Sequence, residues 1–147
     1  MSLSAPLQEL DPRATALVGE GRAALAADNV EGAIDAFEAA LAIQPGSTAI
    51  TLDLAEATRR QGLQGKALHY YREALERDPR NVAAISGEGA ALLEKGAVEK
   101  AKRNLARLQT LCGTSCPEAE SLAALIARTP ERVASAEGAK PSPVVAN

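Results

Sequence analysis

The stretch VEGAIDAFEAALAIQP, residues 30 to 45, decides how this chain folds. The apolar side chains Ile34, Phe37 and Leu41 recur at intervals of three and four residues, which places them on one face of a helix. Pro45 has no amide hydrogen to donate, so the helix is expected to end before it. The stretch therefore predicts one amphipathic helix whose apolar face must pack against a partner.

The same pattern returns at a period of 34 residues. The equivalent positions are Ala33, Ala67 and Ala101; Phe37, Tyr71 and Leu105; Ala40, Ala74 and Leu108; and Pro45, Pro79 and Gly113. A fixed period of this length indicates a stack of supersecondary units that bury their apolar faces against one another.

Each copy divides into two helices. The first copy opens with Asp11, a plausible N-cap, and Pro12, whose missing amide costs little at the first helical position. The pair Asp28-Asn29 gives the turn, and its counterparts Gly62 and Gly96 can take the positive φ that ends a helix. Such short turns predict two antiparallel helices in every copy.

Small residues, an aromatic residue and a closing proline at this period resemble the tetratricopeptide repeat (TPR) family. The resemblance covers residues 14 to 115 and implies an all-α fold, a right-handed superhelix of three antiparallel helix pairs. The expected divisions are an arm at 1–10, a TPR domain at 11–128 with repeats at 14–47, 48–81 and 82–115 and a capping helix at 117–128, and a disordered tail at 129–147.

Two glycine-containing segments, GEGRAAL at 19–25 and GEGAALL at 87–93, invite a nucleotide-binding interpretation. A phosphate-binding loop needs its glycines in a turn directly after a strand. Gly21 and Gly89 instead occupy equivalent repeat positions, with Ala55 between them, where the resemblance implies close contact between paired helices. We therefore expect packing glycines and no bound nucleotide.

The composition of the chain argues against two classes of partner, nucleic acids and the interior of a lipid bilayer. The chain has 147 residues, is 46% apolar and 2% aromatic, and carries a net charge of −3. An acidic chain with few aromatic residues lacks the basic footprint and stacking surfaces of nucleic-acid binders. No apolar run reaches the roughly 18 residues that span a bilayer, so direct membrane insertion is not expected.

Catalysis and metal binding find little support. Glu20 and Glu88 stand two repeats apart, roughly 20 Å by helix packing distances, too far for a pair of catalytic carboxylates. His69, the one histidine, has no metal-ligating neighbours in sequence and is expected on the surface. The segment that holds Lys95, Lys100, Lys102, Arg103 and Arg107 also holds Glu94 and Glu99, and such mixed charges are typical of a solvated helix face. We expect no enzyme activity, cofactor or metal.

Cys112 and Cys116 lie four residues apart where the third repeat meets the cap. A disulfide between them would tie the two together and imply an oxidising compartment. The alternative is a pair of reduced cysteines in a cytosolic protein. An alanine-rich chain with a cysteine-bearing cap resembles exported bacterial TPR proteins, which favours the bridge and a periplasmic or otherwise exported location with the signal removed.

The resemblance implies a concave groove lined by the first helix of each pair, which holds a peptide or a partner helix. Helical spacing assigns to it Val18, Arg22, Leu25, Leu52, Glu56, Arg59, Arg60, Ser86, Ala90 and Leu93. One TPR subclass clamps C-terminal carboxylates with Lys and Asn, but its slots here hold Val18, Arg22, Asp53, Ala83 and Gly87. The clamp is therefore not expected.

The function expected from these features is a non-enzymatic protein-interaction module that binds a peptide or protein, as an adaptor or an assembly subunit. Its local arginine cluster would suit a peptide with a carboxylate among apolar side chains. The alternative is a structural protein that self-associates through its terminal repeat face. With these two functions open, the oligomeric state is expected to be a monomer or a weak homo-oligomer.

Overall fold

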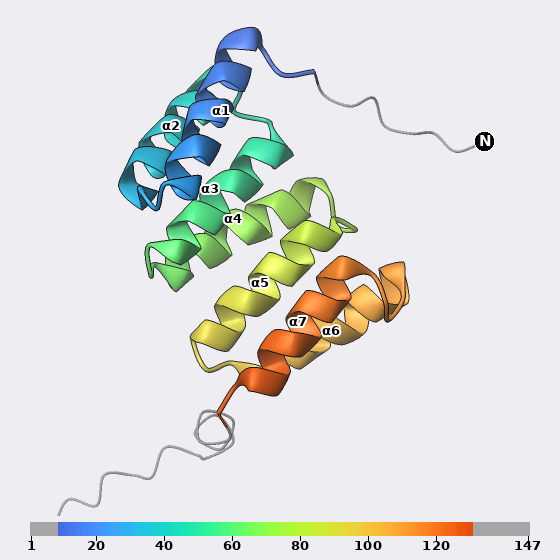
Figure 1. Cartoon of the computed structure of the whole chain (residues 1–147). Coiled ribbons are helices and arrows are strands. Elements are labelled where there is room, and N and C mark those ends of the chain that lie inside the picture. Colours follow the sequence, from blue (N-terminus) through green and yellow to red (C-terminus); the bar gives the residue numbers. More distant parts are fainter. Residues whose placement is uncertain (1–8, 131–147) are drawn as a thin grey trace, which may run out of the picture.

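The computed structural model describes residues 9–130, and this part of the chain contains seven helices and no strand (Figure 1). The helices are α1 (Pro12–Ala26), α2 (Val30–Ile43), α3 (Thr48–Arg60), α4 (Gln64–Arg77), α5 (Val82–Glu94), α6 (Val98–Cys112) and α7 (Pro117–Arg128). The prediction of an all-α repeat fold is confirmed.

Side-chain caps and turn residues set the ends of these helices. Asp11 accepts a hydrogen bond from the amide of Arg13 at the start of α1, directly before Pro12. The turns inside the three pairs contain Asp28, Gly62 and Gly96, with φ of 60°, 91° and 84°. Glycine takes this left-handed conformation without strain, so the turns fall where the sequence predicts them.

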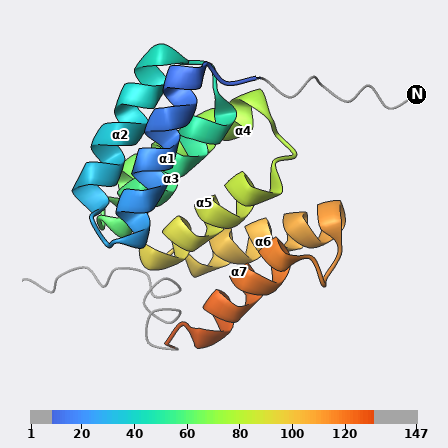
Figure 2. The same ribbon diagram turned by 45° about the horizontal axis from the view of Figure 1, so that its top comes forward.

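Consecutive helices pack as pairs, α1 with α2, α3 with α4 and α5 with α6, while α7 packs against both α5 and α6. The first helices of the pairs and α7 follow one another across one side of the stack (Figures 1 and 2). The repeat-equivalent alanines Ala33, Ala67 and Ala101 are fully buried. The 34-residue period therefore corresponds to one helix pair.

Both glycine-containing segments lie inside helices, GEGRAAL in α1 and GEGAALL in α5. A β-carbon on Gly21 would lie less than 3 Å from the ring of Phe37, and one on Gly89 less than 3 Å from the side chain of Leu122. These glycines are close-contact positions, which excludes a phosphate-binding loop at either segment.

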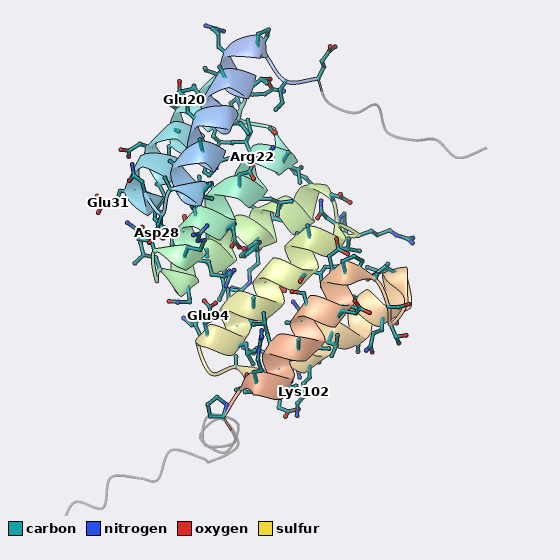
Figure 3. All side chains as sticks on the ribbon, viewed as in Figure 1. Glu20, Arg22, Asp28, Glu31, Glu94 and Lys102 are labelled. Atoms are coloured by element: carbon teal, nitrogen blue, oxygen red, sulfur yellow. A yellow bond between two sulfur atoms is a disulfide. The ribbon has the colours of Figure 1, made fainter. Side chains whose placement is uncertain are left out.

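The outermost helices differ in charge. The exposed face of α2 carries Glu31, Asp35 and Glu38, whereas that of α6 carries Lys100 and Arg103. Within residues 9–130 none of these five side chains enters an ion pair. Glu31 and Lys102 mark the two opposite ends of the molecule (Figure 3).

Most of the expected terminal arm and tail lies outside the described residues. Of the arm, Leu10 packs against the core between α1 and α2, and the carbonyl of Glu9 accepts a hydrogen bond from Gln44 at 3.3 Å. The folded part thus begins before residue 11, because an apolar side chain at position 10 covers the end of the first pair. Within the described part, no helix is both long and apolar enough to cross a bilayer.

Candidate functional site

A hollow of about 450 Å³ lies on the side of the stack formed by α3, α5 and α7. We refer to it as the α3–α5–α7 groove. Its lining residues are Leu52, Glu56 and Arg59 of α3, Tyr71 of α4, Ala83, Ser86, Gly87 and Ala90 of α5, and Pro117, Glu118, Ser121 and Leu125 of α7. A hollow of this size could hold several side chains of a bound segment.

Small residues keep the middle of the groove open. Every residue that α5 contributes is alanine, serine or glycine. Gly87 is required there, because a β-carbon at this position would come within 2.8 Å of the Tyr71 hydroxyl. Leu52 and Leu125 supply apolar walls on either side. The groove therefore offers apolar contact together with close access to the backbone of α5.

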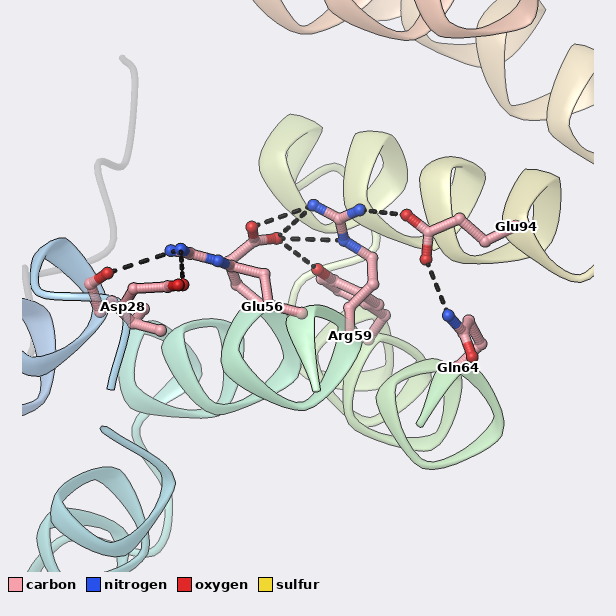
Figure 4. Close-up of polar contacts among 8 residues, drawn as sticks. Asp28, Glu56, Arg59, Gln64 and Glu94 are labelled. Atoms are coloured by element: carbon pink, nitrogen blue, oxygen red, sulfur yellow. Dashed lines mark hydrogen bonds and ion pairs between the residues drawn. The ribbon is translucent and has the colours of Figure 1, made fainter. Parts of the chain in front are cut away.

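An ion-pair network forms one wall of the groove (Figure 4). The guanidinium of Arg59 donates to both carboxylate oxygens of Glu56, at 2.9 and 3.0 Å, and pairs with Glu94 of α5. Gln64 of α4 donates to the second oxygen of Glu94 at 3.2 Å. The network thus joins three consecutive helices, α3, α4 and α5.

Tyr71 of α4 completes this network, donating its hydroxyl to Glu56 at 3.2 Å. Burial raises the pKa of Tyr71, and the nearby Glu56 carboxylate raises it further, so the phenol stays protonated as a donor. Burial alone would lower the pKa of Arg59, but the charges of Glu56 and Glu94 outweigh it and raise that pKa. Arg59 is therefore a permanently charged member of the wall.

No family model matches this sequence, and no curated protein matches it either. Solved structures do match. The Sgt2 TPR domain from Aspergillus fumigatus is 24% identical, with a TM-score of 0.74 over 90% of this chain and 88% of that one. The first TPR of Spaghetti (RPAP3), bound to an HSP90 peptide, is 20% identical, with a TM-score of 0.71 over 90% of this chain and 100% of that one.

A third similar structure is the type III secretion chaperone SycD of Yersinia enterocolitica in complex with a peptide of the translocator YopD. It is 20% identical, with a TM-score of 0.67 over 81% of this chain and 90% of that one. The three matches share one architecture and cover nearly all of the described helices. The chain has the tetratricopeptide-repeat fold.

Five of the ten residues predicted to line the groove of this TPR fold do line it: Leu52, Glu56, Arg59, Ser86 and Ala90. Val18 and Leu93 are instead core residues, exposed to only 6% and 9%. Helical spacing gives the direction of a side chain but not the depth of what packs over it. Neither Val18 nor Leu93 is among the residues that line the groove.

The predicted cluster of arginines is wrong, because each arginine is held by a different partner. Arg59 is held by Glu56 and Glu94, whereas Arg60 turns toward the first pair, 3.7 Å from Asp28 and 3.5 Å from the half-buried Leu25 carbonyl. Arg22 pairs with Asp53 of α3 at 3.0 Å. Arg22, Leu25 and Arg60 lie outside the lining of the groove.

The four residues that α7 contributes to the groove were not among those predicted from the sequence. Pro117 and Ser121 lie 34 residues after Ala83 and Gly87, which line the groove from α5. The repeat period thus continues into α7, which stands where the first helix of a fourth pair would stand. Extending the period past the third repeat would have found these residues.

The other candidate residues, Glu20, Glu88 and His69, lie outside the lining of the groove. Glu88 pairs with Arg72 at 3.5 Å and accepts from Asn104 at 2.9 Å, while Glu20 is exposed on α1, a different pair. His69 is exposed and lies edge-on to Tyr70. The two glutamates are therefore not brought together as an acid and base pair.

The sulfur atoms of Cys112 and Cys116 are bonded as a disulfide between the end of α6 and the start of α7. Glu118 lies close to both sulfurs, and these three residues form the one potential metal-ligand group among residues 9–130. Bridged sulfurs are not thiolates, and thiolate is the form that binds zinc. The disulfide therefore serves to link α6 covalently to α7.

Proposed function

We propose that this chain is a non-enzymatic interaction module that binds a peptide or a segment of a partner protein in the α3–α5–α7 groove. The observation that carries the proposal is the open middle of the groove. Alanine, serine and glycine of α5 line it between the apolar walls of Leu52 and Leu125. Such a surface allows a main chain to approach closely while its side chains contact both walls.

Two further observations support this function. The ion pairs of Arg59 and the bonded Tyr71 hydroxyl fix one wall in place, so little side-chain entropy remains to be lost on binding. Among the proteins of similar structure, the first TPR of Spaghetti holds an HSP90 peptide and SycD holds a YopD peptide. A peptide-binding role is therefore consistent with both the local surface and the fold.

Self-association is the alternative, and the charge difference between the outermost helices favours it. Glu31, Asp35 and Glu38 on α2 would face Lys100 and Arg103 on α6 of a second copy in a head-to-tail contact. Such a contact does not close on itself and would form chains of molecules. Sedimentation velocity at increasing protein and salt concentrations separates the two functions, because only the alternative gives a mass that grows with protein and falls with salt.

The role of the groove in binding is tested by placing a large side chain in it. Ser121→Trp places a large side chain at an exposed position of α7 that lines the groove. Lys66→Trp places the same side chain at an exposed position of α4, outside the groove and outside the charged faces of α2 and α6. The full chain and both variants would be used to capture proteins from lysate of the native organism, and bound proteins would be identified by mass spectrometry. A partner held by the wild type and Lys66→Trp but lost from Ser121→Trp is expected.

Circular dichroism provides the folding control for both variants. If folded Ser121→Trp captures the same partners as the wild type, the groove is not the binding surface. If the three proteins capture only further copies of the chain, self-association replaces peptide binding as the function.

A further inference from the structure

We propose that the α3–α5–α7 groove selects partner segments that carry a basic side chain, lysine or arginine, among small and apolar residues. This inference rests on the proposed function and names the chemistry of the partner. It replaces the carboxylate-bearing peptide that the arginines alone suggested. The selectivity depends on which charges face the groove and which are already paired.

The charges at the groove are mostly negative. Its lining contains one cation, Arg59, and two carboxylates, Glu56 and Glu118. A third carboxylate, Glu94, is bonded to the same guanidinium. Three acidic groups therefore stand against one base at or beside the groove, a balance that favours an added cation over an added carboxylate.

The side-chain exposures of Arg59 and its two carboxylate partners add to the negative balance. The side chain of Arg59 is 21% exposed, whereas those of Glu56 and Glu94 are 42% and 36% exposed. The two carboxylates thus lie nearer to solvent than the cation that they hold. A carboxylate ligand would have to displace one of them from Arg59.

Glu118 supplies a carboxylate with no cation of its own. Its backbone carbonyl accepts a hydrogen bond from Ser86 at 3.3 Å, which holds the first turn of α7 against α5. Glu118 lines the groove, its carboxylate lies within 4.8 Å of the Cys112 and Cys116 sulfurs, and it enters no ion pair within residues 9–130. A lysine or arginine of the partner would pair with this group without breaking any existing contact.

The remaining nearby cations do not reverse this balance. Arg60 turns toward Asp28 and the Leu25 carbonyl, and Arg22 is paired with Asp53. Neither lines the groove. Arg128 enters no ion pair within residues 9–130, but it lines a neighbouring hollow with Glu94 and Leu125 and not the groove itself. With Arg59 and Arg128 set against Glu56, Glu94 and Glu118, the balance of charge stays negative.

A random heptapeptide library displayed on phage tests this inference. It would be selected on the immobilised full chain and depleted on Ser121→Trp, so that only sequences needing the open groove remain. Enrichment of lysine and arginine over aspartate and glutamate is expected. Groove-dependent sequences enriched in acidic residues would overturn the basic-partner inference and leave the proposed function standing. Failure to recover any groove-dependent sequence would overturn the proposed function itself.

A matched pair of charge variants gives the second measurement. Glu118→Gln and Glu120→Gln each remove one negative charge from the first turn of α7, but only residue 118 lines the groove. For a synthetic peptide taken from the selection, we expect the affinity of Glu118→Gln to fall about fivefold at low salt and that of Glu120→Gln to stay unchanged. Equal effects of the two variants would mean that net charge, and not the groove, attracts the peptide.

Discussion

The ring of Phe37 in α2 occupies the space that a β-carbon on Gly21 in α1 would need. A β-carbon there would lie 2.7 Å from ring carbon Cδ1 of Phe37. Phe37 is fully buried, so its ring has no open space to move into. The closeness of the first helix pair therefore depends on the absence of a side chain at position 21.

Gly21→Ala is expected to destabilise the fold by about 1–3 kcal/mol, the usual cost of overpacking a core. Gly19 lies two residues earlier in the same helix, and a β-carbon added there would meet nothing within 4 Å. Gly19→Ala is therefore expected to stabilise by up to about 1 kcal/mol through helix propensity. Urea unfolding followed by circular dichroism measures both. Changes of the same sign would show that packing at Phe37 does not decide the choice of glycine.

Tyr71→Phe removes the hydroxyl that donates to Glu56 and is expected to cost about 1 kcal/mol of stability. The adjacent Tyr70 is a matched control, because it is half-buried and its hydroxyl makes no hydrogen bond in the described part of the chain. Tyr70→Phe is expected to change stability by less than about 0.5 kcal/mol. Thermal unfolding of the two variants tests the difference, and an equal loss in both would mean that the bond to Glu56 contributes nothing.

Much of the fold could be predicted because the repeat is visible in single residue types. The alanines at 33, 67 and 101 and the turn residues Asp28, Gly62 and Gly96 fix both the period and the helix ends. The same period would have placed Ser121 in the groove if it had been carried past the third repeat. Local rules of this kind need no knowledge of contacts distant in sequence.

The polar wall could be predicted only in part. The contact between Glu56 and Arg59 spans three residues of one helix, which sequence spacing allows. The contact between Arg59 and Glu94 joins residues 35 positions apart, and side-chain direction decides it. Thr51 is polar yet fully buried, and its hydroxyl donates to the Ser47 carbonyl at 2.9 Å. Such bonding cannot be read from residue type.

Asp53 makes stability depend on pH. Burial raises its pKa above the ordinary value of 3.8, and the ion pair with Arg22 offsets only part of that effect. The folded chain then holds this proton to higher pH than the unfolded chain does, so stability falls as pH rises from about 3.8 through the raised pKa. Asp53→Asn cannot ionise and is expected to gain melting temperature relative to the wild type across that window.

The measurement for Asp53 is a series of melting temperatures between pH 3 and pH 7. The exposed Asp35 of α2, which enters no ion pair within the described residues, provides the control variant Asp35→Asn, with little change expected. A lower melting temperature for Asp53→Asn than for the wild type at neutral pH would mean that the pair with Arg22 outweighs the cost of burial.

The bridge between Cys112 and Cys116 is expected to stabilise the junction of α6 and α7 by about 2 kcal/mol, the chain-entropy value for so short a loop. A reductant should therefore lower the urea midpoint of the wild type and leave the Cys112→Ser/Cys116→Ser variant unchanged. Thiol titration of unreduced protein from its native source checks the bridge directly. Two reactive thiols would point to a reducing compartment, whereas none would support the predicted exported location, because such bridges persist mainly in oxidising compartments.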